Sequence, residues 1–209
     1  MIEVSEKVNG VNAQVLNEAV HRMMHKPEMA KVTFQVQTSW DSGDGFKLTS
    51  TGKDFLVGGQ KVERQRSFTV VIDNPEVLGG KSEGPTVCEM GMASIGSCVS
   101  QTLIAYATMM GVQLDRIRVE SEADVDVRGM TGISDKVRPG AQEFRLRFHI
   151  ESKTASKEQL KQLYELGKKF SPAVDTVTNG TIIKMSAQVL SESATDDTLA
   201  SQRPDVPTT

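Results

Sequence analysis

The stretch GPTVCEMGMASIGSCVSQTLIAYATMMG, from Gly84 to Gly111, decides the fold of this chain. Within it Thr86 and Glu89 have the spacing of a capping box, in which each side chain can satisfy a free backbone N–H of the other residue. Pro85 before the box and a glycine after the last apolar turn are typical of a helix start and end. We therefore predict a helix of about 24 residues, roughly 36 Å long. No ionised residue follows Glu89 until Asp115, so we expect other elements to surround this helix and make it the core.

The chain has two cysteines, Cys88 and Cys98, and both fall on the predicted helix. Their separation of ten residues corresponds to about 15 Å of helical rise, beyond the roughly 7 Å Cα separation that a disulfide allows. They cannot pair within one intact molecule, so redox chemistry here would use one thiol at a time. Unpaired cysteines are typical of a reducing compartment, and we expect a cytoplasmic protein.

Composition restricts the class of protein. A length of 209 residues suits one domain with appendages or at most two small domains. Apolar residues at 38% and charged residues at 24% are ordinary for a globular protein. A net charge of −3 gives no electrostatic footprint for nucleic acid or an anionic membrane. The chain lacks an uninterrupted apolar run of about 18 residues and a signal-peptide layout, so we expect neither a nucleic-acid nor a membrane partner.

Hydrophobic periodicity predicts the flanking elements. Gly52 and the pair Gly58-Gly59 are interpreted as turns, and Ser156 with Gln159 as the cap of a second helix. The order of elements, with runs of strands interrupted by a few helices, predicts an α+β fold. The predicted segments are a helix over 10–29; strands over 31–39, 46–51, 66–72 (buried on both faces), 117–127, 143–151 and 181–190; a hairpin turn over 41–45; a loop over 129–140; and a short helix opened by Ser171-Pro172.

His21 and His25 lie one turn apart on the first predicted helix and raise the question of a metal site. Glu18 is the one candidate third ligand on that face, and such a set on one helix surface makes a weak site. We favour a solvated face of an amphipathic helix. His149 falls on the polar face of its predicted strand, where we expect exposure to solvent. We therefore expect no metal and no cofactor.

The order of elements and the residues at its centre resemble the OsmC/Ohr superfamily of osmotically induced and organic-hydroperoxide-resistance proteins. Strand SFTVVI, the central helix and strand QLDRIRVESEADVDV follow the layout of that family, and ASIGSC is similar to its AALGSC signature. The resemblance covers residues 31–190. It implies an N-terminal helical extension over 1–30, an OsmC-like domain over 31–190 and a disordered tail over 191–209.

The resemblance implies both a fold and an activity. The family fold is α+β, with antiparallel sheets wrapped around a long buried central helix in an intertwined homodimer. Its characterised members are thiol peroxidases that reduce organic hydroperoxides. In them an Arg and a Glu activate a peroxidatic Cys, and a second Cys resolves the sulfenic acid. Cys98 stands at the peroxidatic position by this resemblance.

The chain departs from the family at the other functional positions. The resolving Cys is replaced by Ser171, and a serine cannot form the disulfide. Cys88 occupies the position of the activating Glu. The neighbouring Glu89 lies about 180° from Cys98 around the helix and could approach a Cys98 only across a dimer. The first hairpin has no Arg, and the nearest cations along the chain are Lys47, Arg64 and Arg66.

Two hypotheses of different classes follow. In the first, Cys98 is the nucleophile of a one-cysteine thiol peroxidase, Arg64 or Arg66 holds the thiolate, and an external thiol reductant resolves the sulfenic acid. In the second, the protein is a non-catalytic OsmC-like homodimer that binds an apolar small molecule at the dimer interface. Methionines could line such a site, although core packing is their commoner role. The methionines concerned are Met90, Met92, Met109 and Met110.

A serine hydrolase built on Ser97 or Ser171 is a third reading with little support. The GSC sequence lacks the strand–turn–helix context of a nucleophile elbow, and no His is evidently placed as a base. Ser171 is explained as a helix N-cap.

Overall fold

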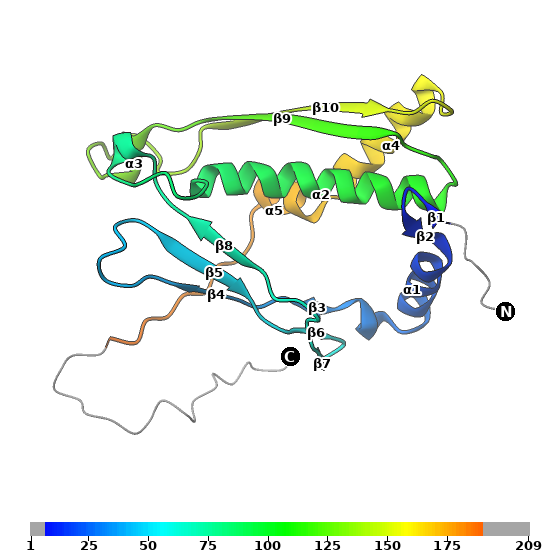
Figure 1. The fold of residues 1–209 in the computed structure, drawn as a ribbon, viewed down its shortest axis with the longest axis horizontal. Coiled ribbons are helices and arrows are strands. Elements are labelled where there is room, and N and C mark those ends of the chain that lie inside the picture. Colours follow the sequence, from blue (N-terminus) through cyan, green and yellow to red (C-terminus); the bar gives the residue numbers. More distant parts are fainter. Residues whose placement is uncertain (1–6, 190–209) are drawn as a thin grey trace.

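The computed structural model describes residues 7–189, and its long helix α2 (Val87–Met109) is the axis of the fold (Figure 1). A two-stranded antiparallel sheet lies above α2 in this view, made of β9 (Arg116–Asp124) and β10 (Glu143–Glu151). Two three-stranded antiparallel sheets form a separate layer below it. Antiparallel sheets with segregated helices define an α+β fold, as predicted.

Helix α2 begins where its capping box predicts. The backbone N–H of Thr86 donates to the Glu89 carboxylate at 2.7 Å, and the N–H of Glu89 donates to the Thr86 hydroxyl at 3.2 Å. The core lies along one side of the helix, where Leu103 and Ala107 are fully buried and pack with Leu163. The opposite side is not covered within the single chain. The prediction of a central core helix is therefore confirmed for one face only.

The sheet above α2 matches the sequence prediction over most of its length. Strand β10 has the predicted bounds, and it pairs with β9 from Glu143↔Asp124 to Glu151↔Arg116. The predicted strand over 117–127 is wrong at its end, because β9 stops at Asp124. The carboxylate of Asp126 then accepts from the N–H of Arg128 at 3.1 Å and caps a short helix, α3 (Val127–Met130), which spans the boundary between the predicted strand and the predicted loop.

Helices α4 (Lys157–Lys169) and α5 (Pro172–Asn179) pack against α2, and both start at the predicted caps. Ser156 and Gln159 form a second capping box, and the Ser171 hydroxyl accepts from the N–H of Val174. At the contact between α4 and α2 stands Gly167. A Cβ there would lie 3.0 Å from the carbonyl oxygen of Val99, so this close approach requires glycine.

The lower layer holds short strands. One sheet comprises β3 (Val32–Thr33), β6 (Phe55–Val57) and β7 (Gln60–Val62), and the other β4 (Val36–Ser39), β5 (Leu48–Gly52) and β8 (Thr69–Ile72). The predicted strand over 31–39 is thus broken in two. The interpretation of Gly52 as a turn is wrong, because it ends β5 beneath the ring of Phe68. Strand β8 is half-buried with Thr69 exposed, so its predicted burial on both faces is also wrong in the single chain.

The N-terminal residues anchor to the far end of α2. A hairpin of β1 (Lys7–Val8) and β2 (Val11–Asn12) precedes helix α1 (Ala13–His25) and a 3-10 turn, η1 (Pro27–Ala30). At the tip of the hairpin Asn9 has φ of +56°, and its amide donates to the carbonyl of Val112 at 2.9 Å. The N–H of Leu114 donates back to Asn9 at 2.7 Å. The hairpin therefore supplies partners for backbone groups just after α2.

The last predicted strand is wrong as far as the structure describes it. Residues 181–189 follow α5 without regular secondary structure, and Ile182, Met185 and Val189 are 86%, 90% and 89% exposed. The strand-like composition is real, but a strand forms only when its backbone has a pairing partner. The predicted tail over 191–209 lies outside the described residues.

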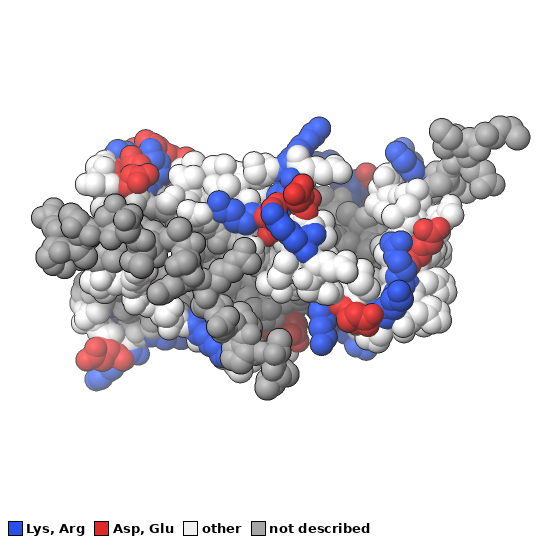
Figure 2. All heavy atoms as spheres, turned by 90° about the horizontal axis from the view of Figure 1, so that it is seen from below, with Lys and Arg blue, Asp and Glu red and all other residues white. Residues whose placement is uncertain are grey.

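The surface seen from below carries Lys and Arg interspersed with Asp and Glu, separated by wide uncharged areas (Figure 2). Within residues 7–189, no helix is both long enough and apolar enough to cross a membrane.

The loop that leads into α2 closes around a buried carboxylate. Asp73 is 2% exposed and accepts three backbone N–H donations, from Asn74 at 2.8 Å, Lys81 at 3.0 Å and Glu83 at 3.2 Å. Burial of Asp73 alone would raise the pKa of its carboxyl, but the three donations outweigh burial and lower it. The ionised form of Asp73 therefore holds the loop, which includes the 3-10 turn η2 (Glu76–Leu78).

Replacing Asp73 with Asn is expected to lower the melting temperature at pH 7 by about 5–10 °C, because an amide NH₂ would face backbone donors. Since the folded pKa is lowered, this stabilisation is present above about pH 4 and is lost as the pH falls through the folded pKa. Thermal unfolding at several pH values measures it. The gap between the two proteins should narrow in acid. Asp135→Asn on the exposed loop is the control, and equal melting of both variants would contradict the account.

Candidate active site

Cys98 occupies a border position on α2. It is half-buried, next to Val99, which is 2% exposed, and to the exposed Ser97. Ser94, Ser97 and Gln101 recur at helical spacing and form an exposed stripe beside Cys98. A thiol at the edge of an open helix face is accessible to a reactant, unlike one packed inside the core.

The polar groups nearest Cys98 along the helix are satisfied by the helix itself. The hydroxyl of Thr102 donates to the carbonyl of Cys98 at 2.9 Å, and that of Ser100 donates to the carbonyl of Gly96 at 2.8 Å. No hydrogen bond or ion pair between described residues reaches the sulfur of Cys98 or of the half-buried Cys88. Within residues 7–189 the Cys98 thiol therefore has no hydrogen-bond or ion-pair partner.

Glu89 is committed to the helix start. Both of its cap bonds are formed, and donation from the backbone N–H and the hydroxyl of Thr86 lowers the pKa of its carboxyl. The carboxylate is therefore ionised at neutral pH and points at the N-terminal backbone. Its position nine residues before Cys98 puts the two on opposite sides of α2, about 180° apart.

Arg64 and Arg66 belong to the lower layer, between β7 and β8. The Arg64 guanidinium lies 5.6 Å from the ring centre of Phe55 and 5.2 Å from that of Phe68, and its Nε donates to the carbonyl of Lys53 at 3.2 Å. Aromatic rings on this scale of distance stabilise a cation and fix its position. Arg66 is exposed. Within one chain, the structure does not bring either arginine to Cys98.

Ser171 is 1% exposed and caps α5 through its hydroxyl. A buried N-cap explains a small hydroxyl residue at this position on structural grounds alone. The four methionines of the second hypothesis are not brought together either. Met92 and Met109 are 17 residues apart on α2, which is about 26 Å of helix. Within one chain, therefore, a single small-molecule cavity cannot be lined by both ends of this set.

His21 and His25 remain on the exposed face of α1. Across residues 7–189 there is no group of three or more His, Cys, Asp or Glu side chains arranged to hold a metal ion. His149 differs from its expectation of exposure, since it is half-buried with Nε2 lying 3.5 Å from a carboxylate oxygen of Glu120. The β9–β10 pairing brings these two side chains together from neighbouring strands.

A cleft of about 480 Å³ that the sequence did not predict adjoins α2. It lies between α2, β10 with its preceding loop, α4 and α5, and its wall includes Ile95 and Val99, three residues before Cys98 and one after it. Its volume is in the range of small-molecule sites. Cys98 itself does not line the cleft, so the thiol and the cleft are separate features of the helix.

Comparison with known proteins identifies the family to which this chain belongs. The model of the OsmC-like protein family matches residues 79–186, which include α2, β9, β10 and α4. The chain therefore belongs to the OsmC-like protein family.

Solved structures agree on the fold. An OsmC-like protein from Mycoplasma pneumoniae is 14% identical over 69% of this chain and 86% of its own, with a TM-score of 0.52. A putative osmotic stress induced and detoxification response protein from Psychrobacter arcticus is 15% identical over 71% of this chain and 89% of its own, with a TM-score of 0.50. No curated protein matches the chain.

Proposed function

We propose that this OsmC-like protein is a one-cysteine thiol peroxidase that reduces organic hydroperoxides through Cys98. The observation that carries the proposal is the placement of Cys98, half-exposed at the edge of the open stripe formed by Ser94, Ser97 and Gln101. The stripe gives a hydroperoxide a path to the sulfur. A reducing compartment, in which the two thiols stay free, suits this chemistry.

The reaction needs one protein thiol and two external electrons. The Cys98 thiolate attacks the terminal oxygen of the hydroperoxide, the O–O bond breaks, and the departing alkoxide takes a proton to become an alcohol. Cys98 is left as a sulfenic acid. An external thiol condenses with it, releases water and forms a mixed disulfide, which a second thiol attacks to restore Cys98 and release a small disulfide. Since Ser171 is a buried cap, resolution by the chain itself is not part of this scheme.

A homodimer would complete the site. The single chain leaves large apolar side chains uncovered in the lower layer, where Phe34, Val36 and Trp40 are 71%, 58% and 55% exposed. Apolar surface of this extent is typical of a protein interface. Packing a second copy beside the open stripe of α2 would bring a cation of its lower layer, such as Arg64, to Cys98 while the stripe still admits the hydroperoxide. A cation there would stabilise the thiolate, which is the form that attacks the peroxide.

The segment 181–189 supplies a test of the dimer. Its exposed apolar side chains and its lack of a pairing partner suit a strand that adds to a sheet of the second copy. A chain ending at Gly180 is expected to weaken the dimer by at least about tenfold, since it loses backbone pairing and apolar burial. Light scattering coupled to size exclusion measures it. A chain ending at Leu190 is the control that should remain dimeric, and a dimer that persists without 181–190 would contradict the assignment.

A second function is favoured by one observation, the absence of any cation contact with Cys98 between described residues. Without a cation, a thiol beside apolar neighbours is a poor nucleophile. The protein would then be a non-catalytic member of its family that binds an apolar small molecule at the dimer interface.

Turnover distinguishes the two functions. The full chain with cumene hydroperoxide and a dithiol is expected to consume peroxide at a rate proportional to protein concentration. Cys88→Ser should keep this rate, because the scheme uses one thiol. Peroxide loss no faster than with the dithiol alone would contradict the peroxidase and leave the binding function.

A further inference from the structure

The cleft beside α2 has an apolar wall and a polar rim. Side chains from the facing elements make the wall, including Ile95, Leu146 and Phe148, and the Phe148 and Tyr164 rings pack with their centres 5.5 Å apart. The cleft stays open although its wall is apolar. Filling it would remove apolar surface from water, so an apolar chain is the occupant that this wall favours.

Positive charge dominates the rim. Arg138 and Lys168 both line the cleft, and Glu143 is the one acidic residue that does so. Glu143 is already engaged, since its carboxylate lies 3.2 Å from Nη1 of Arg145. Lys168 lies 2.8 Å from the carboxylate of Glu165 and 5.6 Å from the ring centre of Tyr164. Arg138 is exposed at the edge of the cleft and has no ion-pair partner among residues 7–189.

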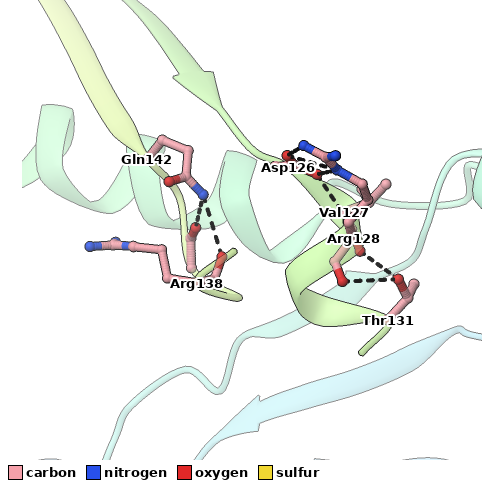
Figure 3. Close-up of polar contacts among 7 residues, drawn as sticks. Asp126, Val127, Arg128, Thr131, Arg138 and Gln142 are labelled. Atoms are coloured by element: carbon pink, nitrogen blue, oxygen red, sulfur yellow. Dashed lines mark hydrogen bonds and ion pairs between the residues drawn. The ribbon is translucent and has the colours of Figure 1, made fainter. Parts of the chain in front are cut away.

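The loop before β10 holds Arg138 in place (Figure 3). The amide of Gln142 donates to the carbonyls of Arg138 at 3.4 Å and Gly140 at 3.1 Å, and the Arg138 guanidinium donates to the carbonyl of Ala141. On the other side α3 packs against this backbone, where a Cβ on Gly129 would lie 2.5 Å from the carbonyl oxygen of Arg138.

The neighbouring Asp126 carboxylate does not neutralise Arg138. Asp126 pairs with Arg128, and the Arg138 side chain extends away from this ion pair (Figure 3). A cation set on a braced loop beside an apolar cavity is arranged to receive an anion whose remainder is apolar.

We propose that this cleft binds a monocarboxylate with an unbranched apolar chain, whose chain lies along the wall and whose carboxylate lies on Arg138, with Lys168 adding positive charge. The site is separate from Cys98, so it does not depend on the peroxidase reaction. Each methylene group buried in the cleft should tighten binding by up to about fourfold, and the carboxylate should add a contribution that depends on Arg138.

The test is calorimetric titration of the full chain with decanoate, octanoate and decanol. Decanoate is expected to bind about tenfold more tightly than octanoate, and more tightly than decanol. Arg138→Gln should weaken decanoate by about tenfold and leave decanol unchanged, because only the charged partner is lost. Lys161→Gln, an exposed lysine on α4 away from the cleft, is the matched control and should bind decanoate like the parent. Cys98→Ser should also bind like the parent.

A second variant tests whether the ligand binds inside the cleft. Val177 lines the cleft and is 58% exposed, so Val177→Trp should fold normally and abolish binding of both decanoate and decanol by filling the mouth. Circular dichroism confirms the fold. Decanoate binding that survives Val177→Trp, or that is equally weakened by Lys161→Gln, would overturn the proposal. A parent protein that binds no decanoate would also overturn it. If in addition Val177→Trp dissociates a dimer, the cleft is a protein interface and not a ligand site.

Discussion

Replacing Cys98 with serine is expected to abolish dithiol-dependent consumption of organic hydroperoxide, leaving the rate of the reductant alone. A serine hydroxyl is not ionised at neutral pH and has no counterpart to the sulfenic acid, so neither half of the cycle can proceed. The structure indicates that the loss would be chemical. Cys98 is half-buried at the edge of α2, its sulfur accepts and donates no hydrogen bond within the described part of the chain, and serine is a smaller residue of similar shape.

The controls separate chemistry from folding. Cys88→Ser removes the other thiol from the same helix, and turnover should stay within about twofold of the parent. Thermal unfolding of both variants should show equal melting temperatures. Full turnover in Cys98→Ser would place the chemistry elsewhere, and equal loss in both variants would make it a property of the helix as a whole.

The largest stability loss is expected from Leu163→Ala. Leu163 of α4 is fully buried and packs in the cluster that contains Leu103 and Ala107 of α2. Truncation leaves a cavity at the contact between the two helices, where Gly167 already brings the backbones close together and limits collapse. We expect a loss of about 2–5 kcal/mol, a large share of the roughly 5–15 kcal/mol that stabilises a typical domain.

Urea unfolding followed by far-UV circular dichroism measures this loss. Ile133→Ala is the matched control, because Ile133 is 73% exposed and its truncation removes similar atoms from the surface. The control should stay within about 0.5 kcal/mol of the parent. Equal unfolding midpoints for the two variants would show that the α2–α4 contact is not the core of the protein.

Local chemistry made much of the fold predictable from the sequence. Three helix starts were predicted correctly, since each signal acts within four residues. The signals are the capping boxes at Thr86 and Ser156 and the pair Ser171-Pro172. Alternation over 143–151 predicted strand β10 because its apolar residues share one face of the strand. These elements needed no knowledge of their neighbours.

The failures arise where neighbours decide the structure. The alternating pattern of a strand continues past Asp124, but the chain leaves the strand there because Asp126 caps helix α3. The segment 181–189 has strand composition and no pairing partner within its own chain. For the same reason, the sequence did not predict which side chains lie near Cys98. Glu89 is an anion and Arg64 a cation, as the resemblance predicted for the activating residues. The helix cap holds Glu89, however, and the rings of Phe55 and Phe68 hold Arg64.

The cleft was not predictable because folding brings residues of α2 together with β10, α4 and α5, which come much later in the sequence. Phe148 and Leu146 have the same alternating pattern whether they fill the core or line a cavity, and periodicity reports only which face of a strand they occupy. Arg138 gave no signal either, since a lone arginine in a polar loop resembles any solvated charge. Its position becomes informative only when Gln142 and α3 are seen to brace the loop.

The central claim is that Cys98 is a peroxidatic thiol, and trapping its sulfenic acid tests this most directly. The full chain would be mixed with cumene hydroperoxide and dimedone, quenched at intervals and digested for mass spectrometry, with N-acetylcysteine as the free-thiol reference. The account predicts a dimedone adduct at Cys98 and none at Cys88, formed at least about 100-fold faster than oxidation of the reference thiol. Oxidation of Cys98 no faster than the reference, or equal labelling of both cysteines, would contradict it.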